Sequence, residues 1–465
     1  MKRVLVITYY WPPSGGSGVQ RWVKFAKYLP AEGWEPIIYT PRNPEMQSED
    51  RSLCADIPEG TEVIRRPITE IYGLYRALTG RKASASEVNV VNRQPKNWKQ
   101  RLVMWIRGNA FIPDPRVTWV RPSVRFLKAW LKEHPVDVIV STGPPHSMHL
   151  IARKVARATG IPWVADFRDP WTKIFYFKHL HLSGFARRRH EKLERQVLDE
   201  ATAVVAVSPL VQEEFRTMTR TRVELITNGY DPDDYARTVE PDGFFNLTHT
   251  GLFAADGNPL ALWKVLGEKV RIDAQFARRL RLRLVGKTDA PVLEAIRSAG
   301  LADQLRDLGY QDHLTAVREQ LGASVLLLPL REEPEYRATL PGKLFEYLGA
   351  HRPILGIGQT DGAMARVVAQ TRSGEVYDWP DEAGLRAAVD RLWDRFLRGE
   401  TGAETDGIEA YSRRSTARRM SALLNDLCRR PGASAPEPLS QGEGSGERAG
   451  RMFHFSCTAP AKRDE

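Results

Sequence analysis

The chain has 465 residues, with 42% hydrophobic residues, 27% charged residues and a net charge of +11, so it can bury a large core and wholesale disorder is excluded. At about 150 residues per domain, this length predicts roughly two to three domains. The three cysteines, Cys54, Cys428 and Cys457, lie far apart, which excludes a disulfide framework and a cysteine-rich zinc site and favours a reducing, cytoplasmic compartment. The sequence has no run of about 18 apolar residues that would predict a membrane-spanning helix, and its first residues are typical of a strand rather than a signal peptide.

Short apolar runs alternate with helical patterns in the first half of the chain, which predicts βαβ units and a parallel sheet. The predicted strands are 3–10, 34–40, 136–141, 162–166, 203–208 and 223–227. The predicted helices include 19–29, 147–158, 186–198 and 210–217. The polar segment 231–243 contains two prolines and is typical of a linker.

A second alternating set follows the linker and predicts another domain of the same class. Its predicted strands are 245–250, 281–285, 305–309, 324–330, 353–357 and 375–377. Its predicted helices are 259–270, 291–298, 314–321, 342–350, 363–370 and 382–397, with a final helix at 412–427. The fold class is therefore α/β, with two doubly wound Rossmann-like domains. The tail 431–465 is rich in Pro, Gly, Ser and Glu, which predicts disorder.

A glycine-rich loop follows the first predicted strand and leads into a helix. Its sequence is Tyr9-Tyr10-Trp11-Pro12-Pro13-Ser14-Gly15-Gly16-Ser17-Gly18. Glycines let the backbone approach a ligand, and a helix N-terminus presents free N–H groups. The order differs from the dinucleotide motif Gly-x-Gly-x-x-Gly, and no acidic residue ends the second strand. We expect a phosphate or sugar near Gly15 and Gly16, with NAD binding and a ligand-free turn as alternatives.

Two later loops of the first half carry the candidate catalytic residues His146, Asp166 and Asp169. His146 precedes a helix, where it could accept a hydroxyl proton or bind a sugar, the alternatives being helix capping and solvent exposure. His149 is more typical of a packed side chain. The two aspartates could bind sugar hydroxyls beside a stacking Trp171, the alternative being an Asp–Arg ion pair that fixes the loop.

In the second half, Lys343 lies in the first turn of a predicted helix, in Pro341-Gly342-Lys343-Leu344-Phe345-Glu346-Tyr347. A cation there is unfavourable to the helix dipole unless an anion docks at that end. Glu346 lies one turn later on the same face, where it could accept hydrogen bonds from ribose. For both side chains the alternative is plain solvent exposure.

Taken together, these motifs resemble those of the retaining GT-B glycosyltransferases of family four, the group 1 type, over roughly residues 1–428. The resemblance rests on the glycine-rich loop, the Asp166–Trp171 element, Pro341–Tyr347 and the strand beginning at Arg352. It implies two Rossmann-like domains facing a cleft, with the final helix crossing back to the first domain. The implied divisions are an acceptor domain at 1–230, the linker at 231–243, a nucleotide-sugar domain at 244–408, the crossing helix at 409–430 and the tail.

The same resemblance assigns donor contacts. It places the ribose at Glu346, the base after Tyr310 and Gln311, and the phosphates at Lys343 and Lys287. Basic side chains and helix N-termini would neutralise the leaving diphosphate, so no metal and no cofactor is expected. The acceptor-side histidine of the family matches His146 approximately. The full set of donor-binding candidates is Gly15, Gly16, Gly251, Lys287, Tyr310, Gln311, Gly342, Lys343, Leu344 and Glu346.

The sequence departs from the family pattern at two places. The family has a second Glu eight positions before the ribose-binding one, and Ala338 stands there. That Glu addresses the transferred sugar; Glu332, Glu333 or Glu335 could substitute for it. The usual Arg and Lys after the first strand of the second domain are also absent, and Gly251–Asp256 stands in their place.

Residues 65–132 hold 15 basic and 3 acidic residues, interleaved with tryptophans such as Trp98, Trp105, Trp119 and Trp130. This composition predicts contact with anionic lipid headgroups. The alternative is a set of core helices with solvated basic faces. Nucleic-acid binding is not expected, because no binding motif accompanies the charge.

The sequence therefore predicts a cytoplasmic glycosyltransferase, peripheral on the inner face of the membrane, that acts in cell-envelope polysaccharide synthesis. It would transfer a sugar, with retention, from a nucleotide diphosphate sugar to a glycan or lipid-linked acceptor. The alternatives are a nucleotide-sugar 2-epimerase on the same fold and a catalytically silent nucleotide- or membrane-binding protein.

Overall fold

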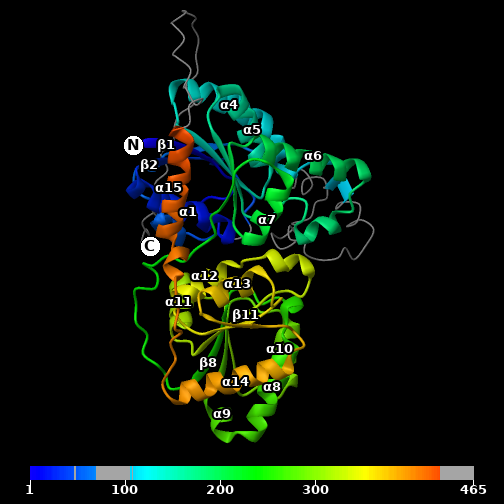
Figure 1. Ribbon diagram of the computed structural model, residues 1–465, viewed down its shortest axis with the longest axis vertical. Helices are drawn as coiled ribbons and strands as arrows, with labels where there is room; N and C mark the ends of the chain where they lie inside the picture. The colour runs from blue at the N-terminus through cyan, green and yellow to red at the C-terminus, as the bar shows by residue number, and fades with distance from the viewer. Residues whose placement is uncertain (47–48, 70–104, 107, 430–465) are drawn as a thin grey trace, which may run out of the picture. The chain divides into compact units, whose positions relative to one another are not determined.

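The computed structural model describes residues 1–46, 49–69, 105–106 and 108–429, and the chain divides into two compact units (Figure 1). The first unit comprises residues 1–206, 212–224 and the chain from 417; the second comprises 207–211 and 225–416. The predicted tail, 431–465, lies outside the described residues, as do 70–104 and 107 of the basic stretch. Within the described part, no helix is both long enough and apolar enough to cross a bilayer.

The first unit is built on a seven-stranded sheet in the order β3-β2-β1-β4-β5-β6-β7. The strands from β1 to β6 pair in parallel. Their bounds are β1 Lys2–Ile7, β2 Trp34–Pro41, β3 Val63–Arg66, β4 Val138–Gly143, β5 Trp163–Phe167, β6 Ala203–Ala206 and β7 Val223–Leu225. The sequence analysis missed β3, since a four-residue edge strand ending in two arginines lacks the apolar run that marked the others.

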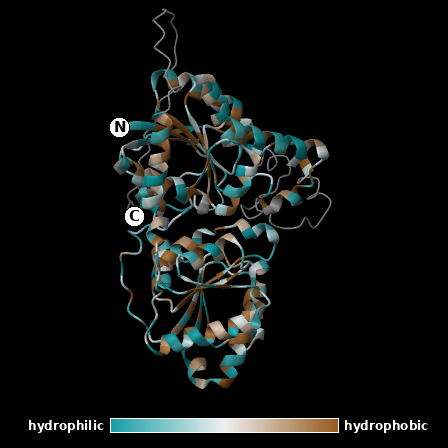
Figure 2. Cartoon of the chain, in the orientation of Figure 1, coloured by the Kyte–Doolittle hydropathy of each residue, from teal (hydrophilic) through white to brown (hydrophobic). Residues whose placement is uncertain are grey.

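Helices cover this sheet and leave its strands buried, which explains their continuous apolar runs. Val4, Leu5, Val6 and Ile7 of β1 are all fully buried, and Figure 2 shows hydrophobic residues along the strands of both units. The helices are α1 Ser17–Tyr28, α4 Val120–Glu133, α5 Ser147–Thr159, α6 Gly184–Glu200, α7 Pro209–Met218 and α15 Arg413–Arg429.

The last helix, α15, contributes to the core of the first unit although it follows the second unit in sequence. Its residues from Ala417 onward belong to the first unit. Met420 and Leu424 are fully buried, and Asn425 accepts a hydrogen bond from Lys2 at 2.8 Å. The first unit is therefore discontinuous along the chain.

The second unit contains a six-stranded parallel sheet in the order β10-β9-β8-β11-β12-β13. The strands are β8 Phe245–Thr250, β9 Leu280–Val285, β10 Leu305–Gly309, β11 Val325–Pro329, β12 Ile354–Ile357 and β13 Gly374–Tyr377. The helices are α8 Leu260–Ile272, α9 Ala274–Arg279, α10 Ala290–Ser298, α11 His313–Leu321, α12 Gly342–Gly349, α13 Ala363–Gln370 and α14 Glu382–Leu397.

Successive residues of the central strand β11 enter two separate apolar clusters. Val325 and Leu327 belong to one cluster, and Leu326 and Leu328 belong to the other. Because successive side chains of a strand point to opposite faces, the sheet is covered on both sides. Its loops are thus held on a rigid core, with every carboxyl strand end at one edge.

Candidate functional site

The loops that follow β8, β9 and β10 are hydrogen-bonded to one another at the carboxyl edge of the second sheet. The Gly251 N–H donates to the carbonyl of Val285, and the Gly286 N–H donates to that of Gly309, each at 2.6 Å. Gly251 and Gly286 have φ angles of 88° and 129°, which favour glycine. A Cβ on Gly251 would lie 2.6 Å from Cε of Lys343. Glycine at 251 is therefore required both by the turn and by the lysine packed on it.

The ammonium of Lys343, in the first turn of α12, is held against the loop after β8. Its Nζ donates to Nε2 of His249 at 3.1 Å and to the carbonyl of Leu252 at 2.9 Å. Burial lowers the pKa of Lys343 to about 8, with the carboxylate of Glu346 acting in the opposite sense. Lys343 is half-buried, so plain solvent exposure, the alternative for this side chain, was wrong.

His249, near the end of β8, is a neutral acceptor for this lysine. Its ring is buried, and Nδ1 lies 3.0 Å from the carbonyl of Leu327. Since a carbonyl only accepts, Nδ1 carries the proton and Nε2 is free to accept from Lys343. Burial, followed by the charge of Lys343, lowers the pKa of His249 well below its ordinary value. His249 was not among the predicted site residues, although its place at a strand end was a usable signal.

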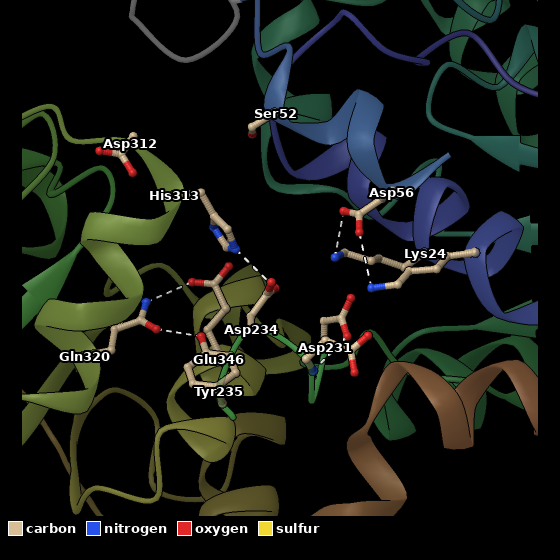
Figure 3. Close-up of polar contacts among 12 residues, drawn as sticks. Lys24, Ser52, Asp56, Asp231, Asp234, Tyr235, Asp312, His313, Gln320 and Glu346 are labelled. Carbon is tan, nitrogen blue, oxygen red and sulfur yellow. Dashed lines mark hydrogen bonds and ion pairs between the residues drawn. The ribbon is translucent and has the colours of Figure 1, made fainter. Parts of the chain in front are cut away.

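Glu346 belongs to a second polar group at the same edge. Its Oε2 accepts from Nε2 of Gln320 at 3.1 Å, and the Gln320 Oε1 accepts from the Tyr235 hydroxyl at 2.6 Å. Figure 3 shows Gln320 beside these two side chains, with a dashed line to each. Gln320 also donates to Thr250, the neighbour of His249. The Lys343–His249 pair and the Glu346–Gln320–Tyr235 group therefore both contact the end of β8.

The remaining donor candidates of the second unit differ in exposure. Tyr310 is 82% exposed directly after β10, so its ring is open to a stacking base. Lys287 and Gly342 are also exposed. Gln311 donates to the Leu308 carbonyl at 2.6 Å. Leu344 is fully buried, and its N–H donates to Pro341, so it supports the helix from within the core.

The position that lacks the family's first glutamate, Ala338, ends a short 3-10 turn, Pro334–Ala338. An ion pair lies near that turn, in which Arg331 contacts Asp256 at 3.0 Å. Burial and the charge of Glu333 raise the pKa of Asp256, against the effect of Arg331. Arg331 is a cation that the sequence analysis missed, and it contacts the same Gly251–Asp256 segment that lacks the usual Arg and Lys.

In the first unit, Arg168 ties together the loops after β1, β4 and β5. One guanidinium nitrogen donates to the carbonyl of Gly18 at 2.7 Å, and the other donates to that of Pro144. Gly16 precedes α1 with a φ of 101°, and a Cβ there would meet no atom within 4 Å. The glycine-rich loop is thus anchored at Gly18 while the backbone at Gly16 stays open.

His146 is buried rather than exposed, and it does not cap α5. Asp114 performs the capping, because its carboxylate accepts from both the N–H and the hydroxyl of Ser147 at 2.8 Å. The His146 ring stacks on Trp171 with 4.5 Å between centroids and 3° between planes. Among the residues that the structure describes, none is a hydrogen-bond partner of either ring nitrogen, and burial lowers the pKa of His146 well below its usual value. Both alternatives for His146 were therefore wrong, and Trp171 stacks on this ring.

His149 is packed, as expected. Its side chain is fully buried and Nδ1 lies 2.8 Å from the Ser141 hydroxyl. Asp166 is also fully buried and forms an ion pair with Arg21 at 2.8 Å, with further hydrogen bonds from Trp22 and Thr142. The structure thus shows the Asp–Arg ion pair that was the alternative to sugar binding, and the partner of Asp166 is Arg21 rather than Arg168.

The comparisons with known proteins agree with this architecture. The model of the glycosyl transferase 4-like domain matches residues 15–229. Over that segment the chain is similar to glycosyl transferase 4-like domains. Among curated proteins, none matches the sequence.

Solved structures of GT-B glycosyltransferases match both units of the chain. Sucrose-phosphate synthase from Thermosynechococcus elongatus matches with a TM-score of 0.60 and 14% identity, over 92% of this chain and 99% of that one. The lipopolysaccharide outer core galactosyltransferase WaaB gives 0.54 and 14%, over 92% and 100%. Anabaena HepE in complex with UDP gives 0.53 and 13%, over 92% and 97%. The chain is a glycosyltransferase with the GT-B fold, as the sequence analysis predicted.

The structure of this glycosyltransferase sorts the site candidates into two groups. Gly251, Lys287, Tyr310, Gln311, Lys343 and Glu346 share the carboxyl edge of the second sheet. Four candidates, Gly15, Gly16, His146 and Asp169, belong to loops of the first sheet, and the side chain of Asp169 is exposed there. Asp166 lies within β5. Their individual roles stay predictions.

Proposed function

We propose that the protein transfers a sugar, with retention, from a nucleotide diphosphate sugar to a glycan or lipid-linked acceptor in cell-envelope polysaccharide synthesis. The observation that carries the donor part is the set Lys343, Glu346 and Tyr310 at one sheet edge. It offers a cation for phosphate, a carboxylate for ribose and an exposed aromatic ring for a base. Open α/β sheets bind ligands at this edge.

In the proposed reaction the bond between the anomeric carbon and the diphosphate oxygen breaks. The acceptor oxygen bonds to that carbon from the face that the diphosphate leaves, and the acceptor proton passes to the departing diphosphate. Lys343 stabilises the charge that develops on the diphosphate, which is electrostatic catalysis. His146 and Asp169 are the candidates for orienting the acceptor hydroxyl.

The donor base can be found with a thermal-shift panel of UDP, GDP, ADP and CMP, with and without magnesium. UDP is the first choice, because the HepE structure holds it. We expect one nucleoside diphosphate to raise the melting temperature without metal. The absence of any shift at millimolar concentration would refute the donor site.

Turnover then distinguishes the proposal from its rivals. We expect release of nucleoside diphosphate only when an acceptor is present, and NMR of the product should show the anomeric configuration of the donor. Consumption of nucleotide sugar without an acceptor would favour a 2-epimerase. Binding without turnover would favour a silent protein, a possibility motivated by Ala338 in place of glutamate.

We also propose that the first unit contacts an anionic membrane surface. Phe185 is 70% exposed and Trp105 is 48% exposed, and the arginines 187–189 next to Phe185 are exposed as well. The two aromatic segments adjoin, because Asn109 accepts from the Ser183 N–H at 2.8 Å. Exposed aromatic rings beside arginines suit a headgroup region.

Sedimentation with phosphatidylglycerol vesicles tests this proposed membrane contact. The Phe185→Ser variant should bind the vesicles several-fold more weakly than the wild type. Equal binding of the wild type to neutral vesicles would contradict the proposal.

A further inference from the structure

A buried glutamine supports the candidate ribose-binding carboxylate from inside the second unit. Gln320 lies on the inner face of α11, beside Val317 and Leu321, and is 1% exposed. A buried amide costs folding free energy unless its polar atoms are hydrogen-bonded. The partners of this amide therefore indicate why a glutamine is kept there.

Both hydrogens of the Gln320 amide and its oxygen have partners. Nε2 donates to the hydroxyl of Thr250 at 3.0 Å and to Oε2 of Glu346 at 3.1 Å. Oε1 accepts from the hydroxyl of Tyr235 at 2.6 Å. Partners from β8, α12 and the segment 231–243 thus fix one side chain.

This pattern permits one orientation of the amide. Rotating it by half a turn would place Oε1 against the carboxylate of Glu346, so that two acceptors would face each other. Tyr235 holds the amide in place as a donor, because burial, followed by the charge of Glu346, raises the pKa of its hydroxyl well above the ordinary value.

The amide engages one carboxylate oxygen of Glu346 and leaves the other available. Oε2 accepts from Gln320, and none of the described residues donates to Oε1. Glu346 itself is half-buried, so its carboxylate still reaches solvent. The arrangement suits a carboxylate that is held at one oxygen and binds a ligand hydroxyl with the other.

We propose that Gln320 is a positioning residue, which orients the Glu346 carboxylate toward the ribose hydroxyls of the bound nucleotide. This inference rests on the proposed function. It adds that ribose recognition depends on a residue of α11 that does not touch the nucleotide, with Tyr235 as the second support.

The test compares affinities for UDP and 2′,3′-dideoxy-UDP, measured by calorimetry on the full chain, or the same pair for the base that the panel selects. Hydrogen bonds to a charged group predict that the wild type prefers UDP roughly 10- to 100-fold. Gln320→Met keeps the length of the side chain and removes its donors, so the preference should fall to about threefold or less, with dideoxy-UDP affinity unchanged. Tyr235→Phe should lower the preference less, and Arg318→Met, on the exposed face of α11, should not change it.

Glu346→Gln separates this inference from the function on which it rests. If Glu346→Gln removes the preference while Gln320→Met lowers both affinities equally, or lowers neither, Gln320 is only structural. If Glu346→Gln also leaves the preference intact, the ribose site of the proposed function is wrong. The result that supports positioning is loss of the preference for UDP in both Glu346→Gln and Gln320→Met, with the affinity of Gln320→Met for dideoxy-UDP unchanged.

Discussion

Nζ of Lys343 lies 3.1 Å from Nε2 of His249, so a lysine and a neutral histidine form a hydrogen-bonded pair at the end of β8. The second acceptor of the lysine is the Leu252 carbonyl. Neither acceptor carries a negative charge, so the ammonium is solvated but not neutralised by them. We therefore predict that an anion binds at Lys343.

Lys343→Ala should therefore weaken UDP binding about 10- to 100-fold, the range for hydrogen bonds to charged groups. Uridine lacks the diphosphate, so its affinity should barely change. Calorimetry with both ligands makes the comparison. Lys264→Ala is the matched control, because Lys264 pairs with Glu382 on the surface of the same unit. Equal losses for UDP and uridine would argue against a phosphate role.

UDP affinity should fall as the pH rises through about 8, the pKa to which burial lowers Lys343. Above that pH the free protein loses the proton that the bound diphosphate requires. The slope should approach tenfold per pH unit, by proton linkage. In Lys343→Arg the charge persists and the profile should be flat to pH 9.5. A wild-type profile that is already flat would rule out titration of this lysine.

The same lysine affects the stability of the unliganded protein in the opposite sense. Because its folded pKa, about 8, lies below its ordinary value, the unfolded chain holds more protons between about pH 8 and 10.5, and the contribution of this group to stability rises with pH in that window. Urea unfolding of wild type and Lys343→Met at pH 7.5 and 9.5 measures it. The wild type should gain relative to the variant at the higher pH.

Asp166→Asn should destabilise the first unit by about 3–5 kcal/mol, since it leaves the buried charge of Arg21 without its partner. Denaturation followed by tryptophan fluorescence checks this. Glu200→Gln disturbs the more exposed pair with Arg153 and should cost about 1 kcal/mol or less. A stable Asp166→Asn protein with abolished turnover would instead favour the catalytic role predicted for this aspartate.

His146→Phe should retain the stack on Trp171 and the melting temperature, while turnover falls at least tenfold if the ring orients the acceptor hydroxyl. The wild-type rate should show no limb near pH 6.5, because burial keeps the pKa of His146 well below that value. A pH–rate profile and a melting curve give both readouts. Unchanged turnover in His146→Phe would assign the histidine to packing alone.

The order of helices and strands could be predicted from the sequence because a doubly covered parallel sheet leaves its apolar runs unbroken. Strands such as Phe245–Thr250 and helices such as Glu382–Leu397 have the predicted bounds. The short edge strand Val63–Arg66 was missed because its four residues are only half-buried and include no apolar run.

Site residues could be predicted from the sequence only where their position at the end of a strand or the start of a helix indicates a chemical role. Lys343 and Glu346 follow from their positions at the start of one helix. Gln320 could not be found this way, since a glutamine within α11 gains its meaning from Tyr235 and Thr250, which lie 85 and 70 positions away. Likewise, nothing in the local sequence indicated that Arg21 would neutralise Asp166.

The discontinuity of the first unit has a consequence for synthesis. A ribosome makes β1 first and the buried residues of α15, among them Met420 and Leu424, more than 400 positions later. The first unit therefore cannot cover the apolar surface that packs against α15 until the whole second unit has been translated. Any chimera that exchanges the second unit must also keep the last helix from the parent that supplies the first unit.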